Sequence, residues 1–490
     1  MHLKKTYKIL ILIFLIVLAT RLYFVFQTPH FENEGYLVKR FVDNILETGN
    51  PLVYDQLSYN GREVLYSPLY HYILAFFGLF LGSGLALKLV PSIFISILVF
   101  IVYGLSKRLV DNEDLALFIA LMSGFIPIVF TETLANASIY TLVIPIMFYL
   151  VYLFMDVNNE KKIKKFVFFS FFLSLLHPAA LLFSIGLIFY FILASTEGIK
   201  IGNLKEELII FNILSTFFIQ FLIYKKAFLE YGLNVIWNNI PFGILGSYFD
   251  LDLLSLLYKV GTLVIIFGLV GIIGGIIKKK DKFFLIGGLI LSILILLWLR
   301  LLSPRIGLMF LSIALVLAAV LALNLFLRYL EKTKIPMYRI SFMIIVFGLF
   351  ILSLVVPTYY YTSRQLNEQV PNDYEILVLN WIKDNSLPDV TVLAPLEFGH
   401  VISGVAGKRT VLDSNFLLAP DTSERYEDVK LLYSTKSEVT ALELIEKYNI
   451  DYIFIPIETE LKYGKVKWTD DTNCFKGRFF GTPKVYQVIC

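Results

Sequence analysis

Four charged side chains stand next to long hydrophobic segments of this sequence, where an ionisable group is costly and therefore points to function. They are Glu34, Glu132, Arg300 and Arg305. An arginine presents a planar fork of donors that matches phosphate oxygens, and a carboxylate can take a proton from a hydroxyl nucleophile. One acid and one phosphate-binding arginine suffice to displace a phosphate leaving group, because phosphate needs no general acid, unlike the leaving group in glycoside hydrolysis. A direct displacement of this kind inverts the reacting carbon.

Structural explanations stand beside these assignments. Glu132 also fits a helix end that meets water, and Arg305 fits an interfacial anchor whose charged head reaches the lipid headgroups. Three further cations, Arg21, Lys39 and Arg40, are predicted to contact headgroups or to lie on helix surfaces.

The composition is that of a membrane protein with several spans. Of the 490 residues, 57% are hydrophobic and 17% are charged, against roughly 45–50% and 25% in soluble domains. The net charge is +4, and the lysines stand at the ends of apolar segments rather than in a basic run, which argues against nucleic acid as a partner. With two cysteines, Cys474 and Cys490, a thiolate metal site is excluded. Whether these two form one bridge is left open.

About eleven apolar segments are candidates for crossing a bilayer, which takes about 20 residues per helix. The first has the charged start of a signal peptide, but its apolar run is too long and lacks a cleavage site, so we expect a retained span. Cations between the segments, Lys278–Lys280 and Lys334 among them, fall on one side of the membrane. This predicts a multi-pass protein of the cell membrane with a cytoplasmic N-terminus. The predicted spans lie near 7–27, 88–106, 114–131, 139–155, 166–177, 179–194, 208–224, 258–277, 283–299, 306–327 and 339–357.

This topology requires that residues 68–82 do not cross the membrane. The segment begins with Pro68 and is short for a span, so we expect a helix at the outer interface, inside a first outer loop of residues 28–86. Residues 225–257 predict a second outer loop that forms a partly ordered lid. Its Asp250 and Asp252 fit a helix start or a metal site.

A histidine and a proline separate the fifth and sixth predicted spans. Proline removes a backbone donor and disfavours helix in the residue before it, so the chain is expected to break at His177-Pro178. A break at membrane depth is tolerated where it faces protein or a water-filled cavity. His177 is therefore a candidate substrate contact, or else a histidine bonded to a neighbouring carbonyl.

Residues 361–490 have a different composition and predict a soluble α/β domain on the extracytoplasmic side, beside a membrane domain of residues 1–360. Apolar strands that alternate with helices imply a largely parallel sheet covered on both faces. Ser437 is a predicted N-cap, and Glu397 and His400 could contact an acceptor or simply form a polar loop at a strand end. We expect strands at 390–398, 409–415 and 451–457, helices at 373–385, 400–407 and 437–449, and a hairpin at 473–490.

Five short segments carry a resemblance to a known superfamily. The chain resembles the C-type (GT-C) membrane glycosyltransferases, which include oligosaccharyltransferase catalytic subunits and the protein mannosyltransferases that use polyprenyl-phosphate sugars. In oligosaccharyltransferases an acid in an Asn-Asp-Gly-Tyr-like context of the first loop is catalytic. The similar segments are NEGY (33–36), TETLANASIYTL (131–142), LHPAAL (176–181), SPRIGLMFLSIAL (303–315) and the outer-domain stretch 379–415.

The resemblance implies a role for each candidate. Glu34 and Glu132 would be the catalytic acids and Arg305 would meet the lipid phosphate, with further substrate contacts from a second set of residues. A Mg or Mn site built from Glu34, Glu32 and Glu132 is conceivable. The second set is Arg300, His177, Glu32, Tyr36 and His400.

The implied reaction transfers a sugar or glycan that is linked to a polyprenyl-phosphate or polyprenyl-diphosphate carrier, such as one built on dolichol, to a protein or to a lipid-linked glycan. Oligosaccharyltransferases carry a Trp-Trp-Asp-Tyr-Gly signature that reads the acceptor asparagine, whereas this chain has PLEFGH at 395–400. Transfer to asparagine therefore remains an alternative. Another is a non-catalytic lipid-glycan transporter or binding protein, although the sequence shows no clear internal repeat.

Overall fold

The computed structural model describes residues 2–250, 252–278, 281–332 and 336–490. Lys279, Lys280 and Lys334, which entered the cation count, lie outside this part of the chain. The chain forms two compact units, each assembled from three stretches of sequence. The helical unit comprises Met1–Gln27, Lys88–Ile223 and Phe249–Leu366, and the α/β unit comprises Thr28–Leu87, Tyr224–Tyr248 and Asn367–Cys490. The predicted domain border at residue 360 is not tested by this division and stays a prediction.

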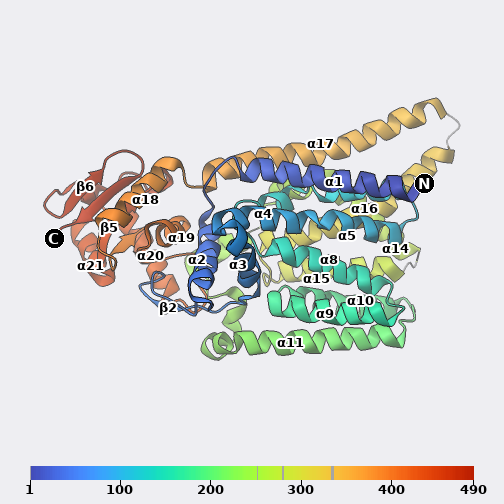
Figure 1. The fold of residues 1–490 in the computed structure, drawn as a ribbon, viewed down its shortest axis with the longest axis horizontal. Coiled ribbons are helices and arrows are strands. Elements are labelled where there is room, and N and C mark those ends of the chain that lie inside the picture. Colours follow the sequence, from blue (N-terminus) through green and yellow to red (C-terminus); the bar gives the residue numbers. More distant parts are fainter. Residues whose placement is uncertain (1, 251, 279–280, 333–335) are drawn as a thin grey trace. The chain divides into compact units, whose positions relative to one another are not determined.

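The helical unit contains a helix at each predicted span, and most of its long helices run side by side (Figure 1). In the described residues, six helices are long and apolar enough to cross a membrane, or up to seven spans if the bent pair α13–α14 counts as one. The predicted total of eleven is therefore not confirmed. The helices are α1 (His2–Val25), α4 (Ser83–Ser96), α5 (Leu98–Leu109), α6 (Glu113–Ser123), α7 (Pro127–Thr131), α8 (Tyr140–Met155), α9 (Glu160–Leu176), α10 (Ala180–Thr196), α11 (Asn203–Tyr231), α13 (Leu253–Val260), α14 (Thr262–Ile277), α15 (Asp281–Trp298), α16 (Pro304–Lys332) and α17 (Pro336–Gln369).

Small residues allow the central helices to approach closely. Helix α16 is the most buried of the candidate spans, and α14 packs along it. A Cβ atom on Gly271 would lie 2.0 Å from the carbonyl oxygen of Ala318. Close backbone contact at small residues is the usual way that helices associate in a bilayer, where water no longer drives apolar groups together.

A buried seam of polar side chains joins α9, α10 and α11. The amide of Asn212 donates to Ser170 Oγ at 2.6 Å and accepts from Ser184 Oγ at 2.8 Å. Ser174 and Thr216 share a hydrogen bond of 2.8 Å. Because these groups hydrogen-bond one another across the three helices, they are typical of polar contacts between helices in a membrane.

Ion pairs gather several loops of the helical unit at one end. They join the end of α5 to the α8–α9 loop, and the start of α11 to the start of α15, while Lys282 donates to the carbonyl of Arg108 at 2.9 Å. These contacts bring Arg108 and Lys162, two of the cations counted in the sequence, together at Asp156. The prediction that all the cationic loops lie on the cytoplasmic side stays a prediction. The pairs are Lys107 with Glu113, Arg108 and Lys162 with Asp156, and Lys205 with Asp281.

The α/β unit is built on a five-stranded mixed sheet with the order β4-β3-β5-β7-β6. Strand β3 pairs in parallel with β4 and β5, whereas the β6–β7 hairpin adds antiparallel pairs beside β5. Only half of the pairings are parallel, so the prediction of a largely parallel sheet overstated that part. The strands are β3 (Thr391–Leu393), β4 (Arg409–Thr410), β5 (Ile450–Ile455), β6 (Phe475–Phe479) and β7 (Lys484–Val488).

Most of the elements predicted for this unit form. Ser437 caps α21 by accepting from the Thr440 amide, and Asn372 caps α18 in a reciprocal capping box with Glu375. A disulfide joins Cys474 and Cys490 at the two ends of the predicted hairpin. The helices are α18 (Asp373–Asn385), α19 (Gly399–Val401), η3 (Ile402–Ala406), α20 (Thr422–Ser434), α21 (Glu438–Tyr448) and α22 (Ile457–Tyr463).

Two segments distant in sequence complete the α/β unit. The first loop supplies α2 (Asn33–Thr48), the two-residue strands β1 (Tyr54–Asp55) and β2 (Arg62–Glu63), and α3 (Leu69–Leu81), the helix predicted at 68–82. The second is the region predicted as a lid, which forms short helices η1 (Gly232–Trp237) and α12 (Phe242–Phe249). Asn239 Nδ2 bonds the carbonyls of Phe416 and Ala419, so this segment is held in place rather than loose.

Candidate functional site

Helix α2 carries Glu34 in its first turn. The helix begins after Glu32, whose backbone is extended, and ends at Gly49 in the left-handed conformation. Acidic side chains are favoured in the first helical turn because the unpaired N–H groups there carry partial positive charge. The Glu34 side chain is exposed, and its Oε1 accepts a hydrogen bond of 2.5 Å from Ser414 Oγ.

Asn33, the residue before Glu34, connects α2 with the segment that begins at Gly399. Its Oδ1 accepts from the backbone amides of His400 at 2.9 Å and Val401 at 3.3 Å. These amides lie in the helical turn α19 (Gly399–Val401), so Asn33 caps that segment from another part of the chain. Glu34 and His400 were predicted as site residues independently of each other. The hydrogen bond from the His400 amide to the Asn33 side chain now links the two segments that carry them.

The buried face of α2 packs closely on the same segment. Tyr36 is buried, and a Cβ atom on Gly404 would lie 2.9 Å from the Tyr36 Cβ. Burial raises the pKa of the Tyr36 hydroxyl to about 12, so it stays protonated at neutral pH. Glu32, the residue at the helix start, is buried as well. As substrate contacts, Tyr36 and Glu32 stay predictions.

One turn further, Arg40 faces inward rather than toward headgroups. Its guanidinium bonds Ser403 Oγ at 3.0 Å and forms an ion pair with Asp55, which is almost fully buried. Burial alone would raise the pKa of Asp55, but the charge and hydrogen bond of Arg40, together with the Leu57 amide, outweigh it and lower the pKa. The predicted surface role of Arg40 is wrong, whereas Lys39 forms a surface pair with Asp43, as expected of a helix surface.

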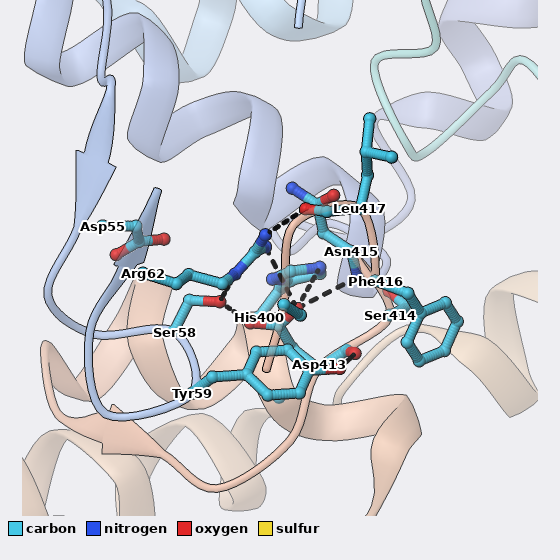
Figure 2. A network of polar contacts seen from close by, with 12 residues as sticks. Asp55, Ser58, Tyr59, Arg62, His400, Asp413, Ser414, Asn415, Phe416 and Leu417 are labelled. Atoms are coloured by element: carbon cyan, nitrogen blue, oxygen red, sulfur yellow. Dashed lines mark hydrogen bonds and ion pairs between the residues drawn. The ribbon is translucent and has the colours of Figure 1, made fainter. Parts of the chain in front are cut away.

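A buried polar network surrounds Asp413, next to Ser414 (Figure 2). Ser58 Oγ donates to Asp413 at 2.5 Å, the Tyr59 hydroxyl donates to its carbonyl at 2.7 Å, and Arg62 lies 3.8 Å from its carboxylate. Arg62 also donates to Ser58 Oγ at 2.7 Å. Three residues of the first loop therefore fix the position of the turn that carries Ser414.

His400 belongs to this network and is fully buried, with its Nε2 3.7 Å from the Asp413 carboxylate. Among the described residues, neither ring nitrogen has a hydrogen-bond partner. A buried imidazole has no direct access to an acceptor in this arrangement. The role of His400 as a substrate contact stays a prediction. Glu397 is exposed and lies 4.0 Å from Lys462, and its role as an acceptor contact also stays a prediction.

In the helical unit, Glu132 ends the short helix α7 and is half-buried. Arg21 of α1 is buried against the residues around it. The Arg21 guanidinium donates to the Thr133 carbonyl at 2.7 Å and to the Thr133 hydroxyl at 2.9 Å, and it lies over the Phe130 ring. The prediction that Arg21 contacts headgroups is therefore wrong: it holds the turn that bears Glu132.

His177 ends α9 at the predicted break, and α10 begins at Ala180. Its Nδ1 accepts from the Ala179 amide at 3.0 Å, so the neutral ring carries its proton on Nε2. The His177 ring lies 5.0 Å from Tyr140, which also contacts Phe310 of α16. This chain of contacts places the break near the beginning of α16.

Arg305 occupies the first turn of α16 and is exposed, and Arg300 precedes it with a left-handed backbone. A cation at a helix N-terminus opposes the helix dipole, so this position gives the helix no stability. Asp252, which the sequence offered as a metal ligand, instead caps α13 by accepting from the Leu254 and Ser255 amides.

The structure offers one cluster of possible metal ligands in the described residues: Glu438, Asp471 and Cys474. Cys474 is part of the disulfide, so its sulfur cannot act as a thiolate ligand. This cluster includes none of the acids proposed for a Mg or Mn site, namely Glu34, Glu32 and Glu132. Such a site stays a prediction.

Comparison with known proteins rests on structure, because no family model and no curated protein matches the sequence. The apo oligosaccharyltransferase of Archaeoglobus fulgidus superposes with a TM-score of 0.70 at 14% identity, covering 99% of this chain and 74% of that one. ArnT of Cupriavidus metallidurans superposes with a TM-score of 0.59 at 9% identity, covering 99% and 98%. The chain has the fold of the GT-C membrane glycosyltransferases.

A third protein with this fold is the arabinofuranosyltransferase AftD from Mycobacteria, with a TM-score of 0.61 at 14% identity over 97% of this chain and 40% of that one. The Archaeoglobus enzyme has also been solved with an inhibitory peptide and a dolichol-phosphate, and ArnT with undecaprenyl phosphate. The GT-C resemblance stated from the sequence motifs is thereby confirmed at the level of the fold.

The sequence analysis missed Asn33 and Ser414. Both had a signal. Asn33 stands directly before the acid in NEGY, and Ser414 lies in the polar run Asp413-Ser414-Asn415 that follows the apolar strand residues. Polar residues where a strand ends are frequent site residues, but no sequence spacing links two positions 380 residues apart.

Proposed function

We propose that this protein is a membrane glycosyltransferase that transfers a sugar from a polyprenyl-phosphate donor at the outer face of the cell membrane. The observation that carries the proposal is the position of Glu34, an exposed carboxylate fixed at the start of α2 in a chain of GT-C fold. The N-terminus would lie in the cytoplasm and the α/β unit outside.

The chemistry assigned to Glu34 is that of a general base. Its Oε2 takes the proton of an acceptor hydroxyl while the acceptor oxygen forms a bond to C1 of the sugar. The bond between C1 and the phosphate oxygen breaks, its electron pair stays on the phosphate, and the anomeric centre inverts. The proton then passes from Glu34 to water. No general acid is required to protonate the leaving group, because the phosphate is already a weak base.

Arg305 is the proposed partner of the departing phosphate. A guanidinium and the free N–H groups of a helix start both favour an anion. Binding of a phosphate explains why an exposed arginine, with no ion-pair partner among the described residues, occupies a position that is unfavourable for the helix. Two proteins of this fold have been solved with a lipid phosphate, dolichol-phosphate in one and undecaprenyl phosphate in the other, which supports a lipid phosphate as ligand. Glu132, beside buried Arg21, is the second proposed acid.

The proposed acceptor is a hydroxyl of a protein or of a lipid-linked glycan. Transfer to asparagine is the alternative that the Archaeoglobus fold supports, since that enzyme has been solved with a peptide containing the NVT sequon. The segment at 395–400 lacks the tryptophan pair of oligosaccharyltransferases. An assay with both a sequon peptide and hydroxyl acceptors separates these two reactions.

The test is transfer from radiolabelled polyprenyl-phosphate sugars by the purified full-length protein and by two matched variants. Glu34→Gln keeps the shape of the side chain and is expected to lower turnover by at least about a hundredfold, within the range for loss of a general base. Glu47→Gln changes an exposed acid on the same helix and should turn over as wild type. Wild-type turnover by Glu34→Gln would refute the assignment of the base.

A further inference from the structure

A chain of three side chains ends on Glu34. Asn33 Nδ2 lies 3.3 Å from Ser414 Oγ, and Ser414 Oγ lies 2.5 Å from Glu34 Oε1. We propose that Ser414 is a positioning residue for Glu34, which it holds in the orientation needed to receive a proton. This inference rests on the proposed function and adds to it a residue from the far end of the chain.

The direction of these hydrogen bonds follows from the backbone. The Asn33 side-chain oxygen is occupied by two N–H donors, from His400 and Val401, which fixes the orientation of the amide. Its nitrogen must therefore face Ser414 as a donor. Since Ser414 Oγ accepts this bond, its own hydrogen is free to be donated to Glu34. The chain runs in one direction, from Asn33 to the carboxylate.

The position of Ser414 is also fixed from its other side. Asp413 is fully buried and accepts from Ser58 at 2.5 Å and from the Asn415 amide at 3.0 Å. Figure 2 shows Ser58, Tyr59 and Arg62 gathered around Asp413, directly before Ser414. The loop that carries Glu34 thus also anchors the turn that orients it.

The consequence concerns the two oxygens of Glu34. Ser414 engages Oε1, and in the described part of the chain it is the one side chain hydrogen-bonded to Glu34. A glutamate side chain has three rotatable bonds and loses much conformational entropy when it is held in one rotamer. An exposed glutamate without a hydrogen-bond partner therefore samples many orientations of its carboxylate. The hydrogen bond to Oε1 leaves Oε2 oriented toward the acceptor hydroxyl. The entropic cost of ordering the side chain is then offset in the folded protein, before the substrate binds.

The experiment measures kcat and KM for donor and acceptor in Ser414→Ala, Ser414→Thr and the control Ser434→Ala. Ser434 is an exposed serine of α20 whose Oγ bonds its own helix. We expect Ser414→Ala to lower kcat about tenfold, the effect of losing one hydrogen bond to a charged group, with KM unchanged. Ser414→Thr keeps the hydroxyl and should restore most of the turnover.

A second variant tests the direction of the chain without removing Ser414. Asn33→Asp keeps an oxygen for the His400 and Val401 amides but replaces the donor to Ser414 by an acceptor. The Ser414 hydrogen then turns toward the introduced carboxylate and away from Glu34, and kcat is expected to fall about as far as in Ser414→Ala. This variant also serves if Ser414→Ala does not fold.

The outcomes separate this inference from the proposed function. If Glu34→Gln is inactive while Ser414→Ala keeps full kcat, or if threonine does no better than alanine, the positioning role is wrong and the base assignment stands. An effect on KM instead of kcat would likewise overturn the positioning role. If Glu34→Gln turns over as wild type, the proposed function itself fails. Thermal unfolding of each variant confirms that the measured protein is folded.

Discussion

Arg21 donates two hydrogen bonds to Thr133, one to its carbonyl oxygen and one to its hydroxyl, at 2.7 and 2.9 Å. The arginine comes from the first helix, and the threonine directly follows Glu132. This contact holds an acid-bearing turn from inside the helical unit. The carbonyl of Phe130, on the other side of Glu132, also receives a bond from Arg21, at 3.5 Å.

Replacing Arg21 should therefore destabilise this turn. Arg21→Met leaves two carbonyl groups buried without their donor, at a cost of roughly 1–3 kcal/mol each. Arg21→Lys keeps the charge but has no fork to bond Thr133 and Phe130 together, so it should recover only part of the loss. The measurement is the midpoint of thermal unfolding in detergent. Lys8→Met, near the start of the same helix and exposed, is the control. Equal midpoints for Arg21→Met and wild type would contradict the structural role.

Arg305→Ala tests the phosphate contact. An exposed arginine without an ion-pair partner in the described residues contributes little to folding, so the unfolding midpoint should stay within about a degree of wild type. The KM for the lipid-phosphate donor should rise about tenfold or more, since a charge-assisted bond to phosphate is lost. Arg328→Ala, exposed near the other end of α16, is the matched control. Saturation by the donor at wild-type concentrations would remove Arg305 from the proposed mechanism.

Local pattern was sufficient for most helices and strands. The spacing of apolar residues predicted α18, α21 and β5, the N-cap at Ser437, and the break at His177-Pro178. These features depend on neighbours within one or two turns, which a sequence displays directly. The number of spans was harder, because a short apolar helix such as α8 looks the same to a hydropathy count whether or not it crosses.

The sequence did not predict which side chains are buried by residues far away in the chain. Tyr59, in the predicted first outer loop, is 1% exposed and belongs to the hydrophobic core of the α/β unit. A turn signal was nevertheless present: Asn60-Gly61 ends the connection 56–61 between β1 and β2, and both residues have positive φ, a conformation that Asn and Gly tolerate in turns. Arg21 gave a signal as well, since a lone arginine inside an apolar run usually faces protein and not lipid.

In the network around Asp413, the effects of replacing Arg62 and Asp413 on the stability of the fold should not be additive. Arg62→Met leaves the buried Asp413 carboxylate without its positive neighbour, an imbalance that costs roughly 3–5 kcal/mol. Asp413→Asn in the same chain removes the unbalanced charge, so the double variant should be more stable than Arg62→Met alone. Thermal unfolding, together with protease cleavage of residues 54–66, gives the comparison. A double variant that is less stable than both single variants would show that the charges are not coupled.

The ionised side chain of Asp55 should make the stability of the folded protein depend on pH in the acid range. Its pKa is lowered in the folded protein, mainly by Arg40 acting against the effect of burial. A lowered folded pKa gives stability that is present above the unfolded value of about 3.9 and is lost as the pH falls through the folded value. The gap in unfolding midpoint between wild type and Asp55→Asn should thus be constant above about pH 5 and shrink below about pH 4. A gap that widened with acid would contradict this sign.

Two glycines of α14 differ in how closely the backbone of α16 approaches them, so alanine substitutions at these positions test the packing of the two helices. Gly271 faces the α16 backbone, where an added Cβ would lie 2.0 Å from the Ala318 oxygen, whereas a Cβ on Gly274 would meet Leu325 and Leu321 at 3.6 and 3.9 Å. Gly271→Ala must push the helices apart, at a cost of about 1–3 kcal/mol. Gly274→Ala fills ordinary space in a helix and should be neutral or slightly stabilising. Unfolding midpoints of the two variants, measured side by side in the same detergent, test this packing, and equal midpoints would show that α14 does not approach α16 so closely.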